Sequence, residues 1–242
     1  MGRLHGPMER STMHHTHSAV TAVRLSAAIA FALMLAPAVA AAQQPAATAP
    51  MGFFVTSRGM GDGANLGGLA GADKHCQTLA QAAGGGNRTW RAYLSQTAFQ
   101  TTPQVNARDR IGNGPWFNAR GEIIATNVAE LHGDFQHDRN AIRKPSALDE
   151  NGEIVNGVGD MPNQHDILTG SDSHGRALIG RPAATTCENW TSNGAGYAIV
   201  GHHDRLGGTT TSWNAAHGSN GCSQANLAST GGAGLFYCFA AD

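Results

Sequence analysis

The chain has 242 residues, of which 14% are charged, and its formal net charge is −1. It lacks the surplus of basic residues typical of proteins that bind nucleic acids or anionic membranes, so we expect neither as a partner. Glycine is abundant, at 32 residues, and scattered without a period. This pattern predicts many short elements joined by ordered turns.

The amino-terminal segment has the features of a secretory signal peptide. Arg24 precedes an apolar run too short to span a bilayer, and small residues follow it. We expect a signal peptide over residues 1–42, a disordered lead-in over residues 43–51 and a single domain over residues 52–242. Of the 16 basic and 17 acidic side chains, three arginines and one glutamate lie in residues 1–42, so 13 and 16 remain and the mature net charge is −3. We therefore expect export to the periplasm or the extracellular space, with no transmembrane segment.

The elements of the domain are predicted from periodicity and turn residues. Residues 52–57 read GFFVTS, which is typical of a strand, and residues 72–83 have apolar side chains at helical spacing before the glycines at 84–86. Residues 89–95 alternate like a half-buried strand, and residues 115–131 predict a hairpin that turns at 119–121. A long polar loop follows over residues 132–165, and further short strands are expected within residues 165–172, 196–204 and 234–242. This order predicts an α+β domain with one main helix and antiparallel strands.

The chain has four cysteines, Cys76, Cys187, Cys222 and Cys238. An even number in an exported chain predicts two disulfides, for which three pairings exist. A metal site built on the cysteines is disfavoured because the sequence contains no short Cys-x-x-Cys pair.

Three segments carry a family resemblance: HCQTLAQAAGGGNRTWRAYLS, HDILTGSDSHGR with the following TTCENWTSN, and SWNAAHGSNGCSQANLASTGGAGLFYCF. Together, in this order, they resemble the endostatin-like branch of the C-type lectin-like fold, especially exported bacterial proteins often called lectins. The resemblance covers residues 52–242. It implies a C-type lectin-like fold, the nested pairs Cys76–Cys238 and Cys187–Cys222, and a non-enzymatic binding role. Fold alone is weak evidence for a particular ligand.

The resemblance raises the question of a calcium ion. Sugar-binding relatives of this kind usually offer an acid-Pro-Asn triplet and a Trp-Asn-Asp triplet, whereas here Met161 precedes Pro162-Asn163 and Ala215 follows Trp213-Asn214. A standard calcium–sugar site is therefore doubtful. Calcium requires six to eight oxygen ligands. In the long loop the candidate ligands are Asp149, Glu150, Glu153 and Asp160, and the alternative is a solvated loop that uses these residues in turns.

A sugar groove without metal is the other hypothesis for this region. It would use the aromatic faces of Trp116, Trp190 and Trp213, unless these are core residues, which is the stronger expectation for Trp190. The complete set of candidate ligand-binding residues is Asn163, His165, Asp166, His202, Asp204, Trp213 and Asn214.

Two adjacent histidines follow the apolar run at 197–201. If the segment stays extended, His202 and Asp204 share one face and His203 points to the other, so the adjacent imidazoles cannot hold one ion together. His202 and Asp204 could do so with a third ligand, for which His165 and His217 are the candidates. Without a metal, His202 and Asp204 are expected to shape a binding site at the rim.

Three functions remain open from the sequence. The first is a non-enzymatic exported module that binds a carbohydrate or glycoconjugate. The second is an adhesin-like protein that binds host or matrix proteins. The third is a metal-dependent hydrolase built on His202, Asp204 and a further histidine.

Overall fold

The computed structural model describes residues 49–134, 140–204 and 212–242. The expected signal peptide, residues 43–48 of the lead-in and residues 135–139 of the long loop lie outside these ranges. The helices are α1 (Gly68–Ala82), α2 (Val128–Leu131), α3 (Cys187–Trp190) and α4 (Gln224–Ser229), with short 3-10 turns η1 (Ala107–Asp109) and η2 (Pro182–Ala184). The strands are β1 (Phe53–Val55), β2 (Trp90–Ala92), β3 (Trp116–Phe117), β4 (Ile123–Ala125), β5 (Asp166–Leu168), β6 (Ile199–His202), β7 (His217–Gly218) and β8 (Gly232–Ala240).

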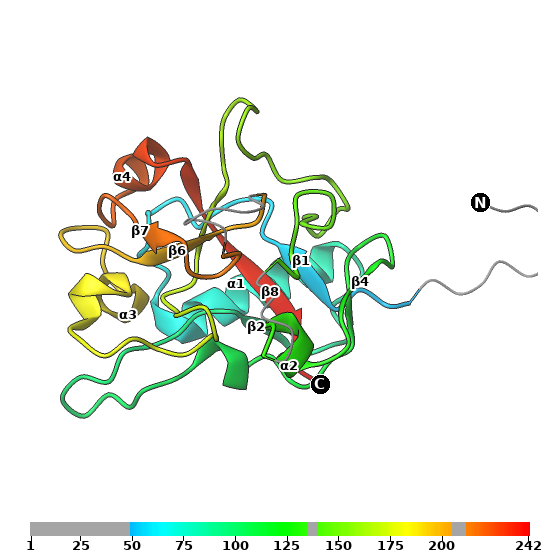
Figure 1. Ribbon diagram of the computed structural model, residues 1–242, viewed down its shortest axis with the longest axis horizontal. Helices are drawn as coiled ribbons and strands as arrows, with labels where there is room; N and C mark the ends of the chain where they lie inside the picture. The colour runs from blue at the N-terminus through cyan, green and yellow to red at the C-terminus, as the bar shows by residue number, and fades with distance from the viewer. Residues whose placement is uncertain (1–48, 135–139, 205–211) are drawn as a thin grey trace, which may run out of the picture. The chain divides into compact units, whose positions relative to one another are not determined.

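Strand β8 is the centre of the main sheet, whose order is β1-β8-β5-β6-β7, with β2 also paired to β8 (Figure 1). Both β1 and β2 run antiparallel to β8, as do β5 to β6 and β6 to β7. The pairing of β5 with β8 is parallel, which differs from the expectation of antiparallel strands only. β8 follows α4 in the chain and runs beside β5 in the same direction. The α+β class is confirmed.

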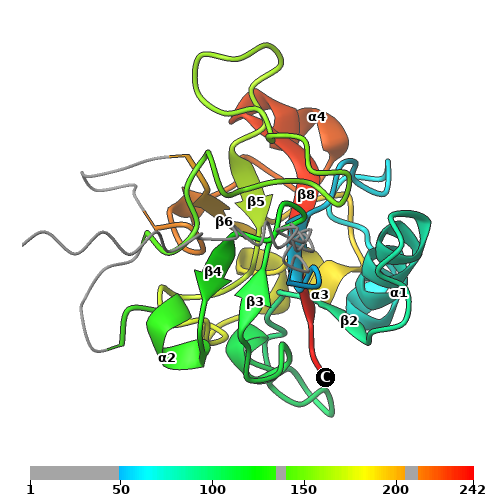
Figure 2. The same cartoon turned by 90° about the vertical axis from the view of Figure 1, so that its right-hand side faces the viewer.

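The sheet has a hydrophobic core on each face. Alternate residues of β8 point to opposite sides. Phe236 and Cys238 pack with α1 on one side, while Tyr237 and Phe239 pack with the β3–β4 hairpin on the other. Figure 2 shows α1 and this hairpin on opposite sides of the sheet. The predicted helix and the predicted hairpin are therefore both present, and each covers one face.

Both disulfides have the pairing that the resemblance implied. Cys76 on the buried face of α1 is bonded to Cys238 of β8, and Cys187 is bonded to Cys222. The first bond closes a segment of 162 residues. It therefore links the first helix of the domain to its last strand.

Helix α3 is a left-handed turn. All four of its residues, none of them glycine, have φ between 48° and 69°. Such a conformation costs an L-residue about 1–2 kcal/mol. Contacts from distant segments hold it: the Trp190 indole donates to Ser95 O at 2.8 Å, and the Asn189 amide bonds both backbone polar groups of Thr97. The side chain of Asn189 is consequently engaged inside the fold.

Asp73 and His132 are buried, and their hydrogen-bond partners lie within the domain. Asp73 of α1 accepts from both Arg110 and Arg91 and from Ala92 N. On the opposite face, His132 Nδ1 donates to Val128 O and its Nε2 lies 2.7 Å from the Tyr93 hydroxyl. These networks satisfy charges and polar groups that burial would otherwise penalise.

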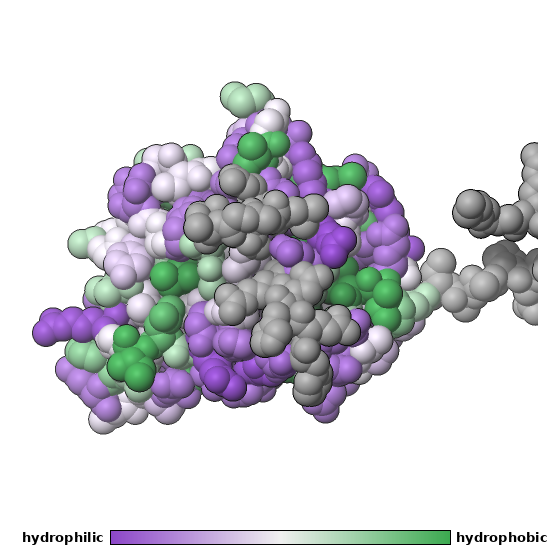
Figure 3. Space-filling view, in the orientation of Figure 1, coloured by the Kyte–Doolittle hydropathy of each residue, from purple (hydrophilic) through white to green (hydrophobic). Residues whose placement is uncertain are grey.

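No helix within the described residues is both long enough and apolar enough to cross a membrane. On the face of the domain shown in Figure 3, hydrophilic residues predominate and hydrophobic residues form small separate patches.

Candidate functional site

Three neighbouring strands bring imidazole and carboxylate groups together. Asp166 at the start of β5 lies directly opposite His202 at the end of β6, and His217 of β7 lies opposite Val200 of β6. His165 precedes β5 by one residue. We call His165, Asp166, His202 and His217 the His/Asp cluster. Its members are up to 52 positions apart in the sequence, and the strand register is what places them side by side.

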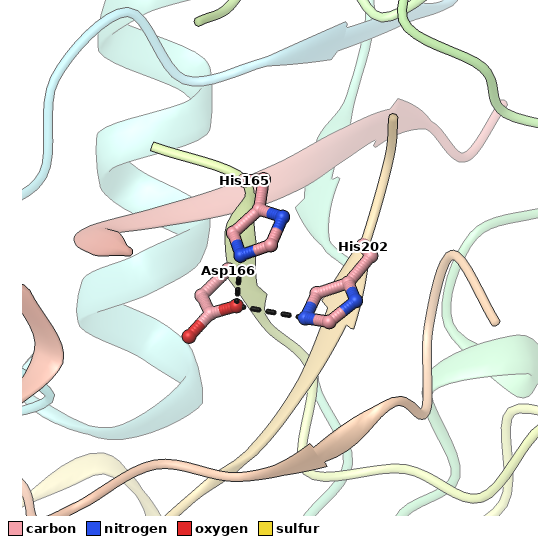
Figure 4. A group of neighbouring side chains, drawn as sticks. All are labelled: His165, Asp166 and His202. Carbon is pink, nitrogen blue, oxygen red and sulfur yellow. Dashed lines mark ion pairs between the residues drawn. The ribbon is translucent and has the colours of Figure 1, made fainter. Parts of the chain in front are cut away.

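The ring nitrogens of the cluster converge on one carboxylate oxygen. Asp166 Oδ1 lies 2.9 Å from His202 Nε2, 3.2 Å from His165 Nε2 and 3.5 Å from His217 Nε2. The Nε2 atoms of His202 and His217 are 3.0 Å apart. The rings of His165 and His202 are stacked, with centroids 4.1 Å apart. Figure 4 shows that the ion pairs from His165 and His202 end on the same oxygen of the Asp166 carboxylate.

The cluster is mostly buried. The side chains of Asp166, His202 and His165 are 2%, 3% and 8% exposed, and His217 is 33% exposed. Burial by itself would raise the pKa of Asp166, but the imidazoles of His202 and His217 outweigh it and hold this pKa below its usual range. The Asp166 carboxylate in turn raises the pKa of His217. Solvent reaches the cluster at His217.

Asp204 lies at the outer side of the cluster. Its Oδ1 is 3.2 Å from His165 Nδ1, and its second oxygen accepts a hydrogen bond from Val158 N. His203 points elsewhere, since its Nε2 contacts Val155 O at 3.2 Å in a fully buried position. The predicted divergence of the two adjacent histidines is confirmed. His165 and His217, the two candidates for a third ligand, both lie beside His202.

The remaining candidate ligand-binding residues have different surroundings. Asn163 Oδ1 accepts from His165 N at 3.3 Å. Trp213 and Asn214 are buried: the Trp213 indole donates to Leu131 O, and the Asn214 amide donates to the Tyr93 hydroxyl. Their side chains therefore support the core and present no face to a ligand in solution. Trp116 and Trp190, the other candidates for stacking on a sugar, are fully buried as well.

The candidate calcium ligands do not converge. Asp149 Oδ1 accepts from the backbone nitrogens of Asn151 and Glu153, which makes a turn, and Glu150 accepts from the backbone and hydroxyl of Ser57. Asp149 and Glu150 are buried in these roles.

Asp160 accepts from Gly157 N and forms an ion pair with Lys144. Within residues 49–134, 140–204 and 212–242, the one grouping of at least three metal-ligating side chains is His165, Asp166 and His202. Its donors are mostly nitrogen, which does not match the oxygen ligands of calcium.

A groove that the sequence did not reveal lies next to the cluster. A volume of about 550 Å³ is lined on one side by Met161–Gln164 and on the other by Gln224 and residues 228–233. A second hollow of about 270 Å³, lined by Ser57–Gly59 and Gly61, shares Gln164 and Gln224 with it. Glutamine is common on protein surfaces, so no sequence signal marked these two positions.

The groove and the cluster meet at Gly231. A Cβ atom at this position would lie 2.5 Å from Asn163 Nδ2 and 2.9 Å from His165 Cδ2. Gly231 lines the groove, and a side chain at this position would collide with Asn163 and His165.

No protein-family model matches the chain, and no curated protein matches it significantly.

Proposed function

We propose that the protein is an exported, non-enzymatic binding protein with a C-type lectin-like domain, and that the groove along Gln164 and Gln224 holds a carbohydrate or glycoconjugate. The observation that carries the proposal is the disulfide pattern. Cys76–Cys238 and Cys187–Cys222 are the pairs that the resemblance implied, out of three pairings that the four cysteines allow. Two disulfides also suit a protein of the periplasm or the extracellular space.

The chemistry of the groove supports a ligand rich in hydroxyl groups. Its polar side chains include the amides of Asn163, Gln164 and Gln224 and the hydroxyl of Ser229. Within the described ranges, the amides of Gln164 and Gln224 make no hydrogen bond. An amide offers two donors and an acceptor, which suits neighbouring sugar hydroxyls. Arg58 at the second hollow adds one positive charge, which would favour a sugar that carries a carboxylate or sulfate.

A glycan array probed with the purified mature protein tests the proposal. We expect binding to a subset of glycans, with that binding weakened about tenfold or more by Gln164→Ala and Gln224→Ala because each removes unpaired amide donors from the groove. Gln81→Ala is the matched control, since Gln81 is an exposed glutamine on α1 outside the groove. Binding to no glycan, together with saturable binding to a matrix protein, would overturn the lectin function in favour of an adhesin.

A further inference from the structure

The donor atoms of the His/Asp cluster lie close enough together to share one metal ion. Bonds of about 2.0–2.1 Å to nitrogen and oxygen place neighbouring ligand atoms about 3.3 Å apart around a tetrahedral ion. Four of the six separations among the donors are 2.9, 3.0, 3.2 and 3.5 Å. A fifth, between the ring nitrogens of His165 and His202, is within 4.8 Å. The four short separations lie near the distance that a shared ion would impose. His165, Asp166 and His202 form the group whose ligand atoms all lie within 4.8 Å of one another, and His217 lies next to Asp166 and His202.

Hydrogen bonds at Nδ1 of His217 and His165 determine which ring nitrogen carries the lone pair. His217 Nδ1 lies 2.9 Å from Gly218 O, and because a carbonyl only accepts, this nitrogen is the donor. His165 Nδ1 faces the Asp204 carboxylate in the same way. In the neutral imidazole the other nitrogen then carries a lone pair. Both Nε2 lone pairs therefore face the cluster, where that of His217 accepts from His202 Nε2 at 3.0 Å. Partners at the outer nitrogen hold metal-binding histidines in the same way.

The Asp166 carboxylate gives a second, independent indication. Three imidazole nitrogens lie within 3.5 Å of Oδ1, yet in the described part of the chain neither buried oxygen of Asp166 has a partner in hydrogen-bonding geometry. The nitrogens are thus close to the oxygen without aiming their N–H bonds at it. A cation among these donors would satisfy the carboxylate and replace the hydrogen bond between His202 and His217. The rings of His165 and His202 are nearly parallel, so one of them would turn to bring both nitrogens onto the same ion.

We propose that His165, Asp166, His202 and His217 bind one Zn²⁺ ion, with Asp204 orienting His165 from outside. Three nitrogens and one carboxylate oxygen in a tetrahedron suit zinc, and they do not suit calcium or magnesium. The charges also balance, because Zn²⁺ with Asp166 and Asp204 gives a neutral site. Copper(II) would compete for the same ligands, since affinity generally rises toward copper among these metals.

The proposed ion has a structural role. Four protein ligands complete the tetrahedron, which is typical of structural zinc, whereas catalytic zinc keeps a position open. The ion would join the edge strands β6 and β7 to β5 and fix His165 beside the groove. The cluster would hold zinc whether or not the groove binds a sugar.

Metal analysis and calorimetry of the mature protein test the site. After treatment with a chelator and dialysis, we expect one equivalent of added Zn²⁺ to bind and to raise the melting temperature by several degrees. Bound Co²⁺ should give the intense visible absorption of a four-coordinate ion. His217→Ala, chosen because this ligand is the most exposed, should weaken zinc binding about 100-fold or more.

His174→Ala is the matched control, because this imidazole is also partly exposed and pairs with Asp134 outside the cluster. It should bind zinc like the wild type. Asp204→Asn retains the size of the side chain and should cost about 10- to 100-fold in zinc affinity as an orienting partner. Circular dichroism of each variant establishes that it is folded.

Three results would overturn the inference: zinc well below one equivalent in the folded wild type, equal affinity in His217→Ala, or a weak six-coordinate Co²⁺ spectrum. In that case the cluster is an ion-pair network without metal. Zinc binding without glycan binding would leave this inference intact and remove the lectin function, whereas glycan binding without zinc would do the reverse.

Discussion

The buried carboxylate of Asp73 should be one of the most sensitive positions for stability. The side chains of Asp73 and Arg110 are 12% and 11% exposed, and the guanidinium lies 2.8 Å from each carboxylate oxygen. Burial lowers the pKa of Arg110, and the Asp73 carboxylate opposes this effect. Removing one member of such a pair leaves an uncompensated buried charge and costs about 3–5 kcal/mol. Asp73→Ala also removes the acceptor for Ala92 N.

Urea unfolding followed by tryptophan fluorescence measures this loss. With a slope of about 2–3 kcal/mol per molar urea, the midpoint should fall by roughly 1–2 M. Asp242→Ala is the matched control, because Asp242 is 49% exposed and its ion pair with Arg88 should be worth about 1 kcal/mol or less. Asp73→Asn, which keeps an acceptor but no charge, should lie between them. An Asp73→Ala variant that is no less stable than Asp242→Ala would contradict the assignment of a stabilising role to this ion pair.

Two further predictions concern the disulfides and pH. In the chain-entropy model, a disulfide that closes 162 residues stabilises the fold by about 5 kcal/mol, and one that closes 35 residues by about 4 kcal/mol. Replacing Cys76 and Cys238 by alanine should therefore lower the free energy of unfolding more than replacing Cys187 and Cys222. The opposite order in denaturant melts would contradict this prediction. Burial lowers the pKa of His132 from 6.5 to about 4, so the unfolded state takes up this proton first and the protein loses up to about 3 kcal/mol as the pH falls from 6.5 to 4. His132→Gln should remove that part of the acid sensitivity. If the loss of stability between pH 7 and pH 4, measured by unfolding curves, is the same in this variant as in the wild type, His132 has no such role.

Local signals predicted the local elements. Helix α1 ends at Ala82, next to the glycines expected to terminate it, and the hairpin turns between Phe117 and Ile123 as the sequence indicated. In both cases the information lies within a few residues of the element. The left-handed turn at Cys187–Trp190 has no such signal, since contacts about 90 residues away hold it in place.

The candidate site was predictable in part. Strand alternation correctly separated His202 from His203, because it depends only on the local backbone. That Asp166 lies between three histidines depends on the register of β5 with β6, which a single sequence does not specify. Trp213 was assigned to a ligand site from a family pattern. In the structure its indole is buried and packs in the core beside Tyr237.

The position of β8 at the middle of the sheet sets an order for folding during synthesis. Every other element of the domain precedes it in the chain, yet β1, β2 and β5 all pair with it. A chain that emerges amino end first therefore exposes three strands without their common neighbour until its final residues arrive. Over the same interval the thiol of Cys76 has no native partner, so premature pairing with Cys187 or Cys222 is the characteristic error that an oxidising compartment would have to correct.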